Sequence, residues 1–184
     1  MRLFVVMSLV AFTSGCAEFW EMNAQNPKVE VPPYNAAEYQ PYLQSGSGSI
    51  SGQAFLLNKS GEPKKAAGKD VTLDPATAMA RAWWNSARAW TRMEPRLPED
   101  ARFAAARKTT TADAEGRFSF EHLPAGDYLV RTTVKWEPER CAEYGSSCST
   151  QEGVIGGLVH LNAGEKKNVI FGKDAVALPD GKGK

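Results

Sequence analysis

The sequence predicts an all-β protein folded as a sandwich of two sheets, with one helix inserted. Seven short segments alternate apolar and polar residues as half-buried strands do, and turn sequences separate them. One segment, residues 75–94, is rich in alanine and has helical periodicity instead. The chain has 184 residues, 42% of them hydrophobic, which is room for one globular domain with extensions or for two small domains.

The N-terminal residues have the features of an export signal. One arginine, Arg2, precedes an apolar run from Leu3 to Phe12, which is too short for the roughly 20 residues of a membrane span. Small residues follow and end at Cys16. Residues 1–15 with this cysteine resemble a bacterial lipoprotein signal peptide, in which the cysteine becomes the lipid-bearing first residue. An ordinary secretory signal with an unrelated cysteine is the alternative.

The lipoprotein resemblance implies a location for the protein. It implies acyl chains such as palmitate on Cys16, and a mature chain anchored in the cell envelope. Ala17 follows the cysteine, where an aspartate would favour retention at the inner membrane, so the resemblance implies the outer membrane. Phe19 and Trp20 suit the membrane–water interface beside such an anchor.

Residues 16–47 are predicted to form a tether behind the lipid anchor. Prolines make the first part extended, and the run SGSGS makes the end flexible. Tyr34, Tyr39 and Tyr42 are more tyrosines than an inert linker needs. We therefore expect part of the tether to pack against the domain. At the other end, the polar residues 173–184 are predicted to be a flexible tail.

The predicted strands are separated by turn sequences such as DAEG and NAGE. They cover residues 49–57, 69–73, 107–112, 116–120, 127–136, 153–161 and 166–171. Phe118 and Phe120 share one face of the fourth strand, and alternate residues from Tyr128 to Trp136 share one face of the fifth. We expect these faces to form the core between the two sheets.

The helix predicted over residues 75–94 is amphipathic. Pro75 suits a first helical turn, and Pro95 ends the helix. At about 100° per residue, the large apolar side chains fall in one stripe, which we expect to pack on the sandwich. The members of this stripe are Met79, Trp83, Trp90 and Met93.

The opposite face of this helix is the candidate binding surface. It consists of three arginines with a tryptophan at the edge: Arg81, Trp84, Arg88 and Arg92. Arginine pairs bidentately with phosphate and carboxylate groups, and an exposed tryptophan can stack on a sugar ring or a cation. A plain solvated face is the alternative. Exposure of Trp83 and Trp90 would favour a sugar site, and their burial a structural role.

The cysteine count agrees with export. With Cys16 acylated, Cys141 and Cys148 remain as an even pair, and an oxidising compartment allows them to join. The disulfide would close a short loop that contains glycine and serine and would contribute about 2–3 kcal/mol. A redox pair usually has C-x-x-C spacing, and a zinc site would need two further ligands.

The run TTTADAEGRFSFEHLPAGDYLVRTTV, residues 109–134, resembles the signature of carboxypeptidase regulatory-like domains. The pattern is a threonine-rich strand, an acidic turn with glycine, F-x-F and then L-P-x-G-x-Y. SGSISGQAF and GEKKNVIF resemble the first and last strands of that family. The resemblance covers residues 48–172, with an insertion at about 74–107. It implies a single seven-stranded Greek-key sandwich of the transthyretin-like, or prealbumin-like, type.

No catalytic, metal or phosphate-binding motif stands out in the sequence. His122 and His160 are isolated, and no G-x-S-x-G elbow or phosphate loop is present. The formal net charge of +1 gives no global reason to expect nucleic-acid binding. We therefore expect no enzymatic activity, no catalytic residues, no metal and no cofactor.

These observations predict a non-enzymatic cell-envelope lipoprotein whose sandwich has a structural or protein-interaction role. The alternative is a carbohydrate-binding module for an envelope or extracellular glycan. It follows from the resemblance, because the same sandwich superfamily contains starch-binding-like domains. The expected partners are the membrane, through the lipid anchor, and an envelope protein or glycan.

Overall fold

The computed structural model describes residues 28–30, 32–58, 61–89, 92–94, 101–136, 151–172 and 176–177. The signal segment, the lipid-attachment residue Cys16 and the cysteine pair Cys141 and Cys148 lie outside these ranges. So do Trp90 and Pro95. No helix in the described ranges is long and apolar enough to cross a membrane.

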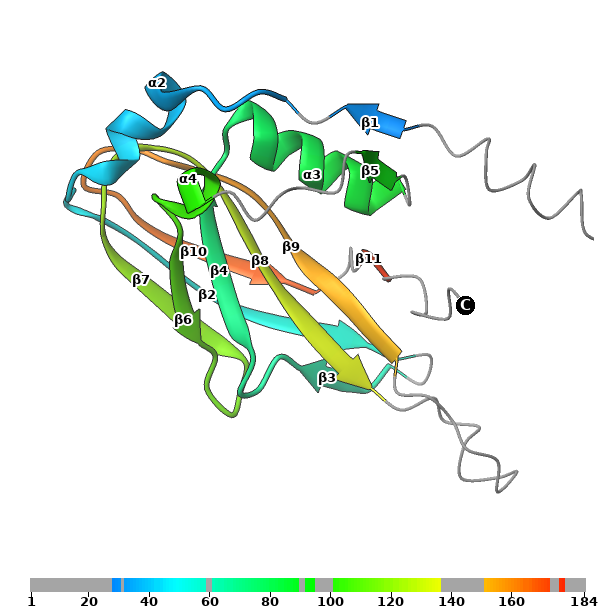
Figure 1. Ribbon diagram of the computed structural model, residues 1–184. Helices are drawn as coiled ribbons and strands as arrows, with labels where there is room; N and C mark the ends of the chain where they lie inside the picture. The colour runs from blue at the N-terminus through cyan, green and yellow to red at the C-terminus, as the bar shows by residue number, and fades with distance from the viewer. Residues whose placement is uncertain are drawn as a thin grey trace, which may run out of the picture.

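Two β-sheets pack face to face, which confirms the predicted sandwich (Figure 1). The four-stranded sheet consists of β10 (Lys166–Phe171), β2 (Gly48–Leu57), β3 (Pro63–Lys65) and β7 (Arg117–Leu123). Its strand β2 pairs in parallel with β10 and antiparallel with β3 and β7. The five-stranded sheet is antiparallel and runs in the order β11 (Val176–Ala177), β9 (Gln151–Leu161), β8 (Gly126–Trp136), β4 (Asp70–Pro75) and β6 (Lys108–Thr111).

All seven predicted strands are present, and the described residues contain four further short strands. Strands β1 (Lys28–Glu30) and β5 (Arg92–Glu94) form a separate parallel pair, and β3 and β11 extend the two main sheets. Strand β11 lies in the segment that the sequence predicts to be a flexible tail. Its two residues pair with Val154 and Gly153 of β9, so this part of the segment is a short strand.

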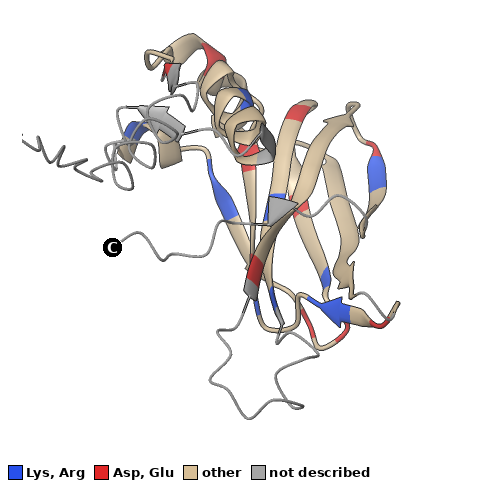
Figure 2. Cartoon of the chain, turned by 90° about the vertical axis from the view of Figure 1, so that its right-hand side faces the viewer, with Lys and Arg blue, Asp and Glu red and all other residues tan. Residues whose placement is uncertain are grey.

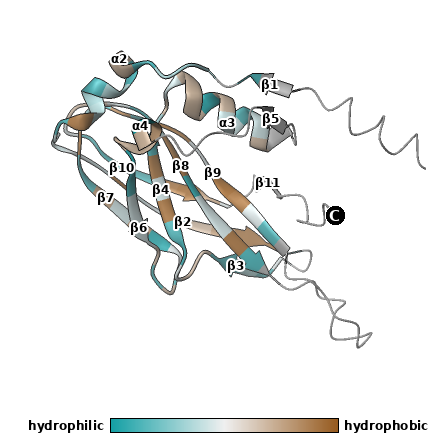
Figure 3. Ribbon diagram, in the orientation of Figure 1, coloured by the Kyte–Doolittle hydropathy of each residue, from teal (hydrophilic) through white to brown (hydrophobic). Residues whose placement is uncertain are grey.

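The core lies between the two sheets, where β8 shows the predicted alternation. Its inward side chains Tyr128, Val130, Thr132 and Val134 are all buried. All of them except Thr132 share one apolar cluster with residues of the neighbouring strands, including Ile50, Leu73, Phe118, Phe120, Leu123, Ile155 and Leu161. Figure 3 shows hydrophobic and hydrophilic residues alternating along these strands. Because side chains alternate, every second residue of the five-stranded sheet points away from this core, to the outer face of the sheet.

Helix α3 (Ala78–Ala89) lies on this outer face, within the connection from β4 to β6 that also contains β5 and α4 (Ala101–Ala104) (Figure 1). The predicted helix is therefore present but shorter at both ends. Pro75 is the last residue of β4 and is fully buried, so its assignment to the first helical turn is wrong. Arg92 and Met93 belong to β5 rather than to the helix.

Trp84 occupies a different position from the predicted one. Its side chain is 3% exposed and packs against Leu129 and Val154 on the outer face of the sheet. The prediction that Trp84 stands at the edge of an exposed face is wrong. One reason is that Met93, which helped to set the predicted stripe, belongs to β5 rather than to the helix. Within α3, burial follows the spacing of Ala80, Trp83 and Trp84.

The N-terminal segment before β2 packs against α3, as expected for part of the tether. It contains α2 (Ala36–Tyr39) and the 3₁₀ helix η1 (Gln40–Leu43). Tyr39 is buried, and its hydroxyl shares a hydrogen bond with the hydroxyl of Thr77 at 3.1 Å. The carboxylate of Glu38 accepts a hydrogen bond from the Ala78 backbone nitrogen at 2.7 Å, which satisfies a donor at the start of α3.

Tyr42 fixes the same segment to the sandwich. Its hydroxyl donates to the Asp127 carbonyl and accepts from the Asp127 backbone nitrogen, both at 3.1 Å. Its ring lies edge-on to Tyr128, with centroids 5.2 Å apart. Gly126 permits this approach, because a Cβ there would lie 2.7 Å from the Tyr42 ring and the residue has φ +155°.

Candidate functional site

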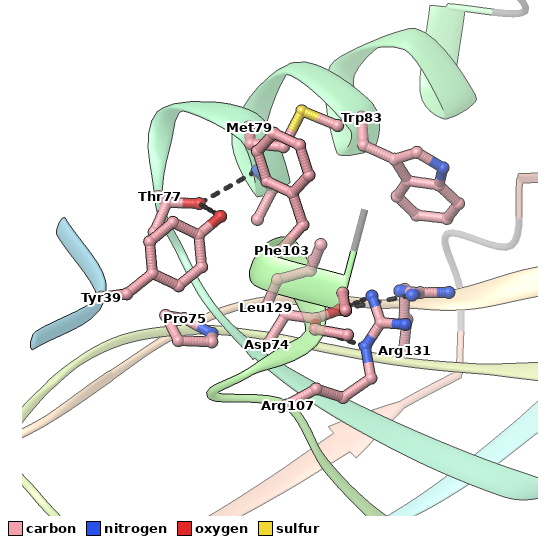
Figure 4. A pocket seen from close by; sticks show the side chains of 13 residues that line it. Tyr39, Asp74, Pro75, Thr77, Met79, Trp83, Phe103, Arg107, Leu129 and Arg131 are labelled. Atoms are coloured by element: carbon pink, nitrogen blue, oxygen red, sulfur yellow. Dashed lines mark hydrogen bonds and ion pairs between the residues drawn. The ribbon is translucent and has the colours of Figure 1, made fainter. Parts of the chain in front are cut away.

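A cavity of about 500 Å³ lies between α3, α4 and the outer face of the five-stranded sheet (Figure 4). Apolar side chains form most of its wall. Two groups of lining residues, one aromatic and one charged, could contact a ligand. The aromatic group is Tyr39, Trp83 and Phe103, and the charged group is Asp74, Arg107 and Arg131. The cavity therefore combines flat apolar surfaces with charged hydrogen-bonding groups.

The charged group is held together by one buried carboxylate. Arg107 pairs with Asp74 through two hydrogen bonds, Nε to Oδ1 at 2.6 Å and Nη2 to Oδ2 at 3.2 Å. Arg131 adds one bond from Nη2 to Oδ2 at 3.2 Å. The Asp74 side chain is 8% exposed, whereas Arg107 is 39% and Arg131 24% exposed. The arginines therefore retain surface for a further partner.

Strand register brings these three residues together. Leu73 faces the core and pairs with Val130, so the next residues along each strand, Asp74 and Arg131, project from the outer face. Arg107 immediately precedes β6, whose first residue pairs with Leu73. The three side chains thus come from neighbouring strands, although 33 and 57 residues separate the arginine positions from Asp74.

Arg131 lies against the indole of Trp83. The guanidinium carbon is 4.4 Å from the centroid of the Trp83 ring, a cation–π contact that fixes the plane of the guanidinium (Figure 4). Its Nε is buried and has no hydrogen-bond partner. Burial lowers the pKa of Arg131, and the Asp74 carboxylate opposes this shift. Arginine nevertheless stays charged in proteins.

Aromatic side chains close the cavity on the side of α2 and α4. Tyr34 stacks on Tyr39 with ring centroids 5.2 Å apart and meets Phe103 edge-on at 5.5 Å. Burial raises the pKa of the Tyr39 hydroxyl, although its hydrogen bond to Thr77 acts in the opposite direction. The docked N-terminal segment therefore helps to build the site.

A second hollow of about 400 Å³ lies further along the same sheet face, and Arg131 borders both. Its lining is more polar and includes Lys69, Asp70, Lys135 and Glu152. Lys135 and Glu152 approach to 3.8 Å. A ligand longer than the first cavity would meet this polar surface next.

The predicted binding surface on the helix is not assembled as expected. The Nη2 of Arg81 pairs with the Asp127 carboxylate at 2.9 Å, and its Nε donates to the Ala76 carbonyl at 2.8 Å. Trp84 is buried, and the side chains of Arg88 and Arg92 lie outside the described residues. Charges of both signs are interspersed along the described strands and loops (Figure 2).

The sequence interpretation placed Trp83 in the core and missed the charged group. Trp83 is half-buried and lines the cavity, and Met79 is buried as predicted. Two signals point to the missed residues: Asp74 directly follows the predicted strand 69–73, and Arg131 has an outward position in strand 127–136. Among the described residues, no group of three or more His, Cys, Asp or Glu could hold a metal ion.

Asp127 forms a second charged cluster at the junction of α3 and β8. Besides Arg81, its carboxylate contacts the Nδ1 of His160 at 2.7 Å. His160 is the main cause that lowers the pKa of Asp127, and Arg81 adds to it. In turn, the hydrogen bond to Asp127 raises the pKa of His160. All three side chains are substantially exposed, so this cluster is a surface ion pair.

The chain is similar in fold to a solved structure that it covers almost completely. It is the crystal structure of a candidate carbohydrate-binding protein from Pseudomonas aeruginosa, with a TM-score of 0.62 and 27% sequence identity over 77% of this chain and 99% of that one. No protein-family model and no curated protein sequence matches the chain.

Two other structures are only weakly similar and carry no functional argument. The major pilin subunit of Bacillus cereus has a TM-score of 0.37 at 13% identity, over 68% of this chain and 30% of that one. A 3-chlorocatechol 1,2-dioxygenase from Rhodococcus opacus has a TM-score of 0.28 at 14% identity, over 79% and 64%. The chain thus shares its β-sandwich fold with a candidate carbohydrate-binding protein, over nearly the whole length of that protein.

Proposed function

We propose that this protein is a non-enzymatic carbohydrate-binding module whose glycan binds in the cavity between α3 and the five-stranded sheet. The observation that carries the proposal is the half-buried Trp83 beside the fixed charged group of Asp74, Arg107 and Arg131. An aromatic face packs against the apolar face of a sugar ring, while the fixed polar groups bind its hydroxyls.

The size and chemistry of the cavity support binding rather than hydrolysis. About 500 Å³ falls within the range of roughly 300–1,000 Å³ for small-molecule sites. Glycoside hydrolysis commonly uses two carboxyl groups across the scissile bond. Among the described residues that line the cavity, Asp74 is the single carboxylate, and two arginines already pair with it. The similarity to the P. aeruginosa protein also supports a glycan ligand.

A structural or protein-interaction role is the second candidate function, and the opposite sheet offers one observation for it. Strand β10 lies at the edge of the four-stranded sheet, and its Ile170 is 69% exposed. Edge strands can bind an extended segment of another protein through their free backbone groups. This surface lies on the other sheet from the cavity, so both roles are compatible in one molecule.

The family and the location belong to the same proposal. We infer a carboxypeptidase regulatory-like, transthyretin-like domain, which the signature of residues 109–134 supports. We also propose that Cys16 carries the lipid, that Cys141 and Cys148 form a disulfide, and that the protein resides at the outer membrane. Labelling with a clickable fatty acid tests the anchor: the wild type should be labelled and Cys16→Ser should not. Equal labelling of both would overturn it.

Binding to an array of envelope and extracellular glycans tests the proposed function with the purified full chain. We expect the wild type to bind a subset of glycans and Trp83→Ala to lose at least tenfold in affinity. Ile170→Ala is the matched control, because it also truncates an apolar side chain but lies on the other sheet. Thermal unfolding checks that each variant folds. Unchanged binding by a folded Trp83→Ala, or no glycan bound by the wild type, would overturn the proposal.

A further inference from the structure

We infer that the glycan is acidic and that its anionic group pairs with the guanidinium of Arg131. The inference rests on the proposed function and specifies the ligand class of the same cavity. It follows from the charge balance of the site, from the incomplete pairing of Arg131 and from the position of that residue between two hollows.

The cavity holds more positive than negative charge. Two guanidinium groups, those of Arg107 and Arg131, face one carboxylate, that of Asp74, among the described residues of the lining. Arginine remains protonated at any physiological pH. Because water screens charges poorly in a partly enclosed site, one uncompensated positive charge favours an anion over a neutral ligand. A cationic sugar would meet repulsion from both arginines.

The two arginines differ in how completely they are paired. Arg107 makes two hydrogen bonds to Asp74, the shorter at 2.6 Å, whereas Arg131 makes one at 3.2 Å. The Nε of Arg131 is buried without an acceptor, which is costly for a polar group. Arg131 therefore has more N–H groups left for a ligand anion than Arg107 has.

Trp83 places the aromatic surface next to this arginine. The contact of 4.4 Å between the guanidinium carbon and the ring centroid orients the planar fork of Arg131. Planar forks pair bidentately with carboxylate, sulfate and phosphate oxygens. In a uronic acid the carboxylate is attached directly to the sugar ring. Because Arg131 covers one face of the indole, a sugar ring would contact the part of Trp83 that remains exposed, and a carboxylate on that ring would lie near the guanidinium.

The second hollow adds no net negative charge that would repel an acidic ligand. Its ionisable lining residues are Lys69, Arg131 and Lys135, against Asp70 and Glu152. Arg131 also belongs to the first cavity, and the other four residues, two positive and two negative, balance among the described residues there. An acidic oligosaccharide that continues past Arg131 thus meets no net repulsion.

The test compares acidic glycans with the same glycans after reduction of each carboxyl group to an alcohol. The array carries oligosaccharides that contain glucuronate, galacturonate or mannuronate, their carboxyl-reduced forms, and sulfated and phosphorylated glycans. We expect the full-length wild type to bind acidic forms at least tenfold more tightly than the reduced forms. The sulfated and phosphorylated glycans show which anionic group the site takes.

Two variants connect the preference to Arg131. Arg131→Gln should reduce the ratio of acidic to reduced binding to near one, whereas Arg117→Gln, at an exposed position outside the cavity, should leave it unchanged. If Arg131→Gln does not fold, salt dependence replaces it: raising the salt concentration should weaken binding to acidic glycans more than to reduced ones. Equal wild-type binding to both forms would overturn this inference and leave the proposed function intact. No binding to any glycan would overturn the proposed function itself.

Discussion

Strand β8 contributes to both faces of the five-stranded sheet, and the two faces differ in chemistry. Inward, Tyr128, Val130 and Val134 join an apolar core against the second sheet. Outward, Leu129 packs under Trp84, and two positions further along Arg131 pairs with Asp74. The inner face is filled by apolar side chains, whereas the outer face holds charged groups around a cavity.

This comparison shows how a sandwich acquires a site without disturbing its core. Because neighbouring residues of a strand point to opposite faces, the inner side chains are free to maximise apolar burial. The outer ones carry charged groups, which α3 and the N-terminal segment only partly cover. Core packing and the candidate binding site therefore depend on alternate positions of the same strands.

Trp84→Ala should have the largest effect, because it tests whether the outer face is packed as firmly as the inner one. We expect a loss of about 3–5 kcal/mol in the free energy of unfolding, the usual cost for a large buried aromatic residue. Leu73→Ala, on the inner face, should lose about 2–5 kcal/mol. Urea unfolding measures both. A loss below about 1 kcal/mol for Trp84→Ala would show that α3 is not part of the cooperative fold.

Asp74→Asn tests the charged group on the outer face by removing its one carboxylate. Two neighbouring guanidinium groups would then lack their counter-ion, and we expect a loss of about 2 kcal/mol. This value lies below that of a fully buried pair because both arginines are partly exposed. Thermal unfolding at low and high salt measures it, and the loss should shrink at high salt. A stability equal to the wild type at low salt would contradict the role given to Asp74.

Glu38→Gln tests the docking of the N-terminal segment on the outer face. The carboxylate caps the first turn of α3, where negative charge is favourable, and we expect a loss of about 1 kcal/mol. Glu121→Gln, an exposed glutamate on β7, is the control and should stay within about 0.5 kcal/mol of the wild type. Equal unfolding midpoints for the two variants would show that Glu38 does not stabilise the docking of the N-terminal segment.

The smallest effect is a pH dependence at the junction of α3 and β8. His160 has a raised pKa, so its contribution is complete below its ordinary value of 6.5 and is lost as pH rises through the raised value. Asp127 has a lowered pKa, so its contribution is present above its ordinary value of 3.8 and is lost at lower pH. The ion pair should therefore stabilise most between these two values.

Thermal unfolding of the wild type and His160→Gln across pH measures this window. The difference in melting temperature should be greatest near pH 5 to 6 and should disappear in alkaline solution. Because both groups are exposed, we expect a small difference even at its maximum. A difference that grows with pH would contradict the assigned direction of the His160 pKa.

The strands could be predicted from sequence because their signal is local. The alternation from Tyr128 to Val134 and the F-x-F pair at Phe118 and Phe120 each lie within one segment, and all these residues face the core. The helix was predicted correctly as an element, but its orientation depended on where it ends. Met93, which helped to set the predicted apolar stripe, belongs to β5, and the buried side of α3 includes Trp84.

The charged group of the site could not be predicted in the same way. Asp74, Arg107 and Arg131 are separated by tens of residues, and no local period relates them. Only the pairing of β4 with β6 and β8 brings them side by side. Arg81 shows the converse, because its helical position suggested a free basic face, and its actual partner, Asp127, lies 46 residues away.

The docked N-terminal segment also sets the length of chain between Cys16 and the folded domain. From Cys16 to Lys28, where β1 begins, the chain has twelve residue steps and reaches at most about 40 Å when fully extended. With a lipid on Cys16, this length would keep the cavity close to the membrane surface. If Tyr39 and Tyr42 detached, the chain would be free as far as about residue 47, and the connection to Cys16 could reach about 100 Å. The contacts that hold this segment beside the cavity would therefore also limit the distance between the cavity and the membrane.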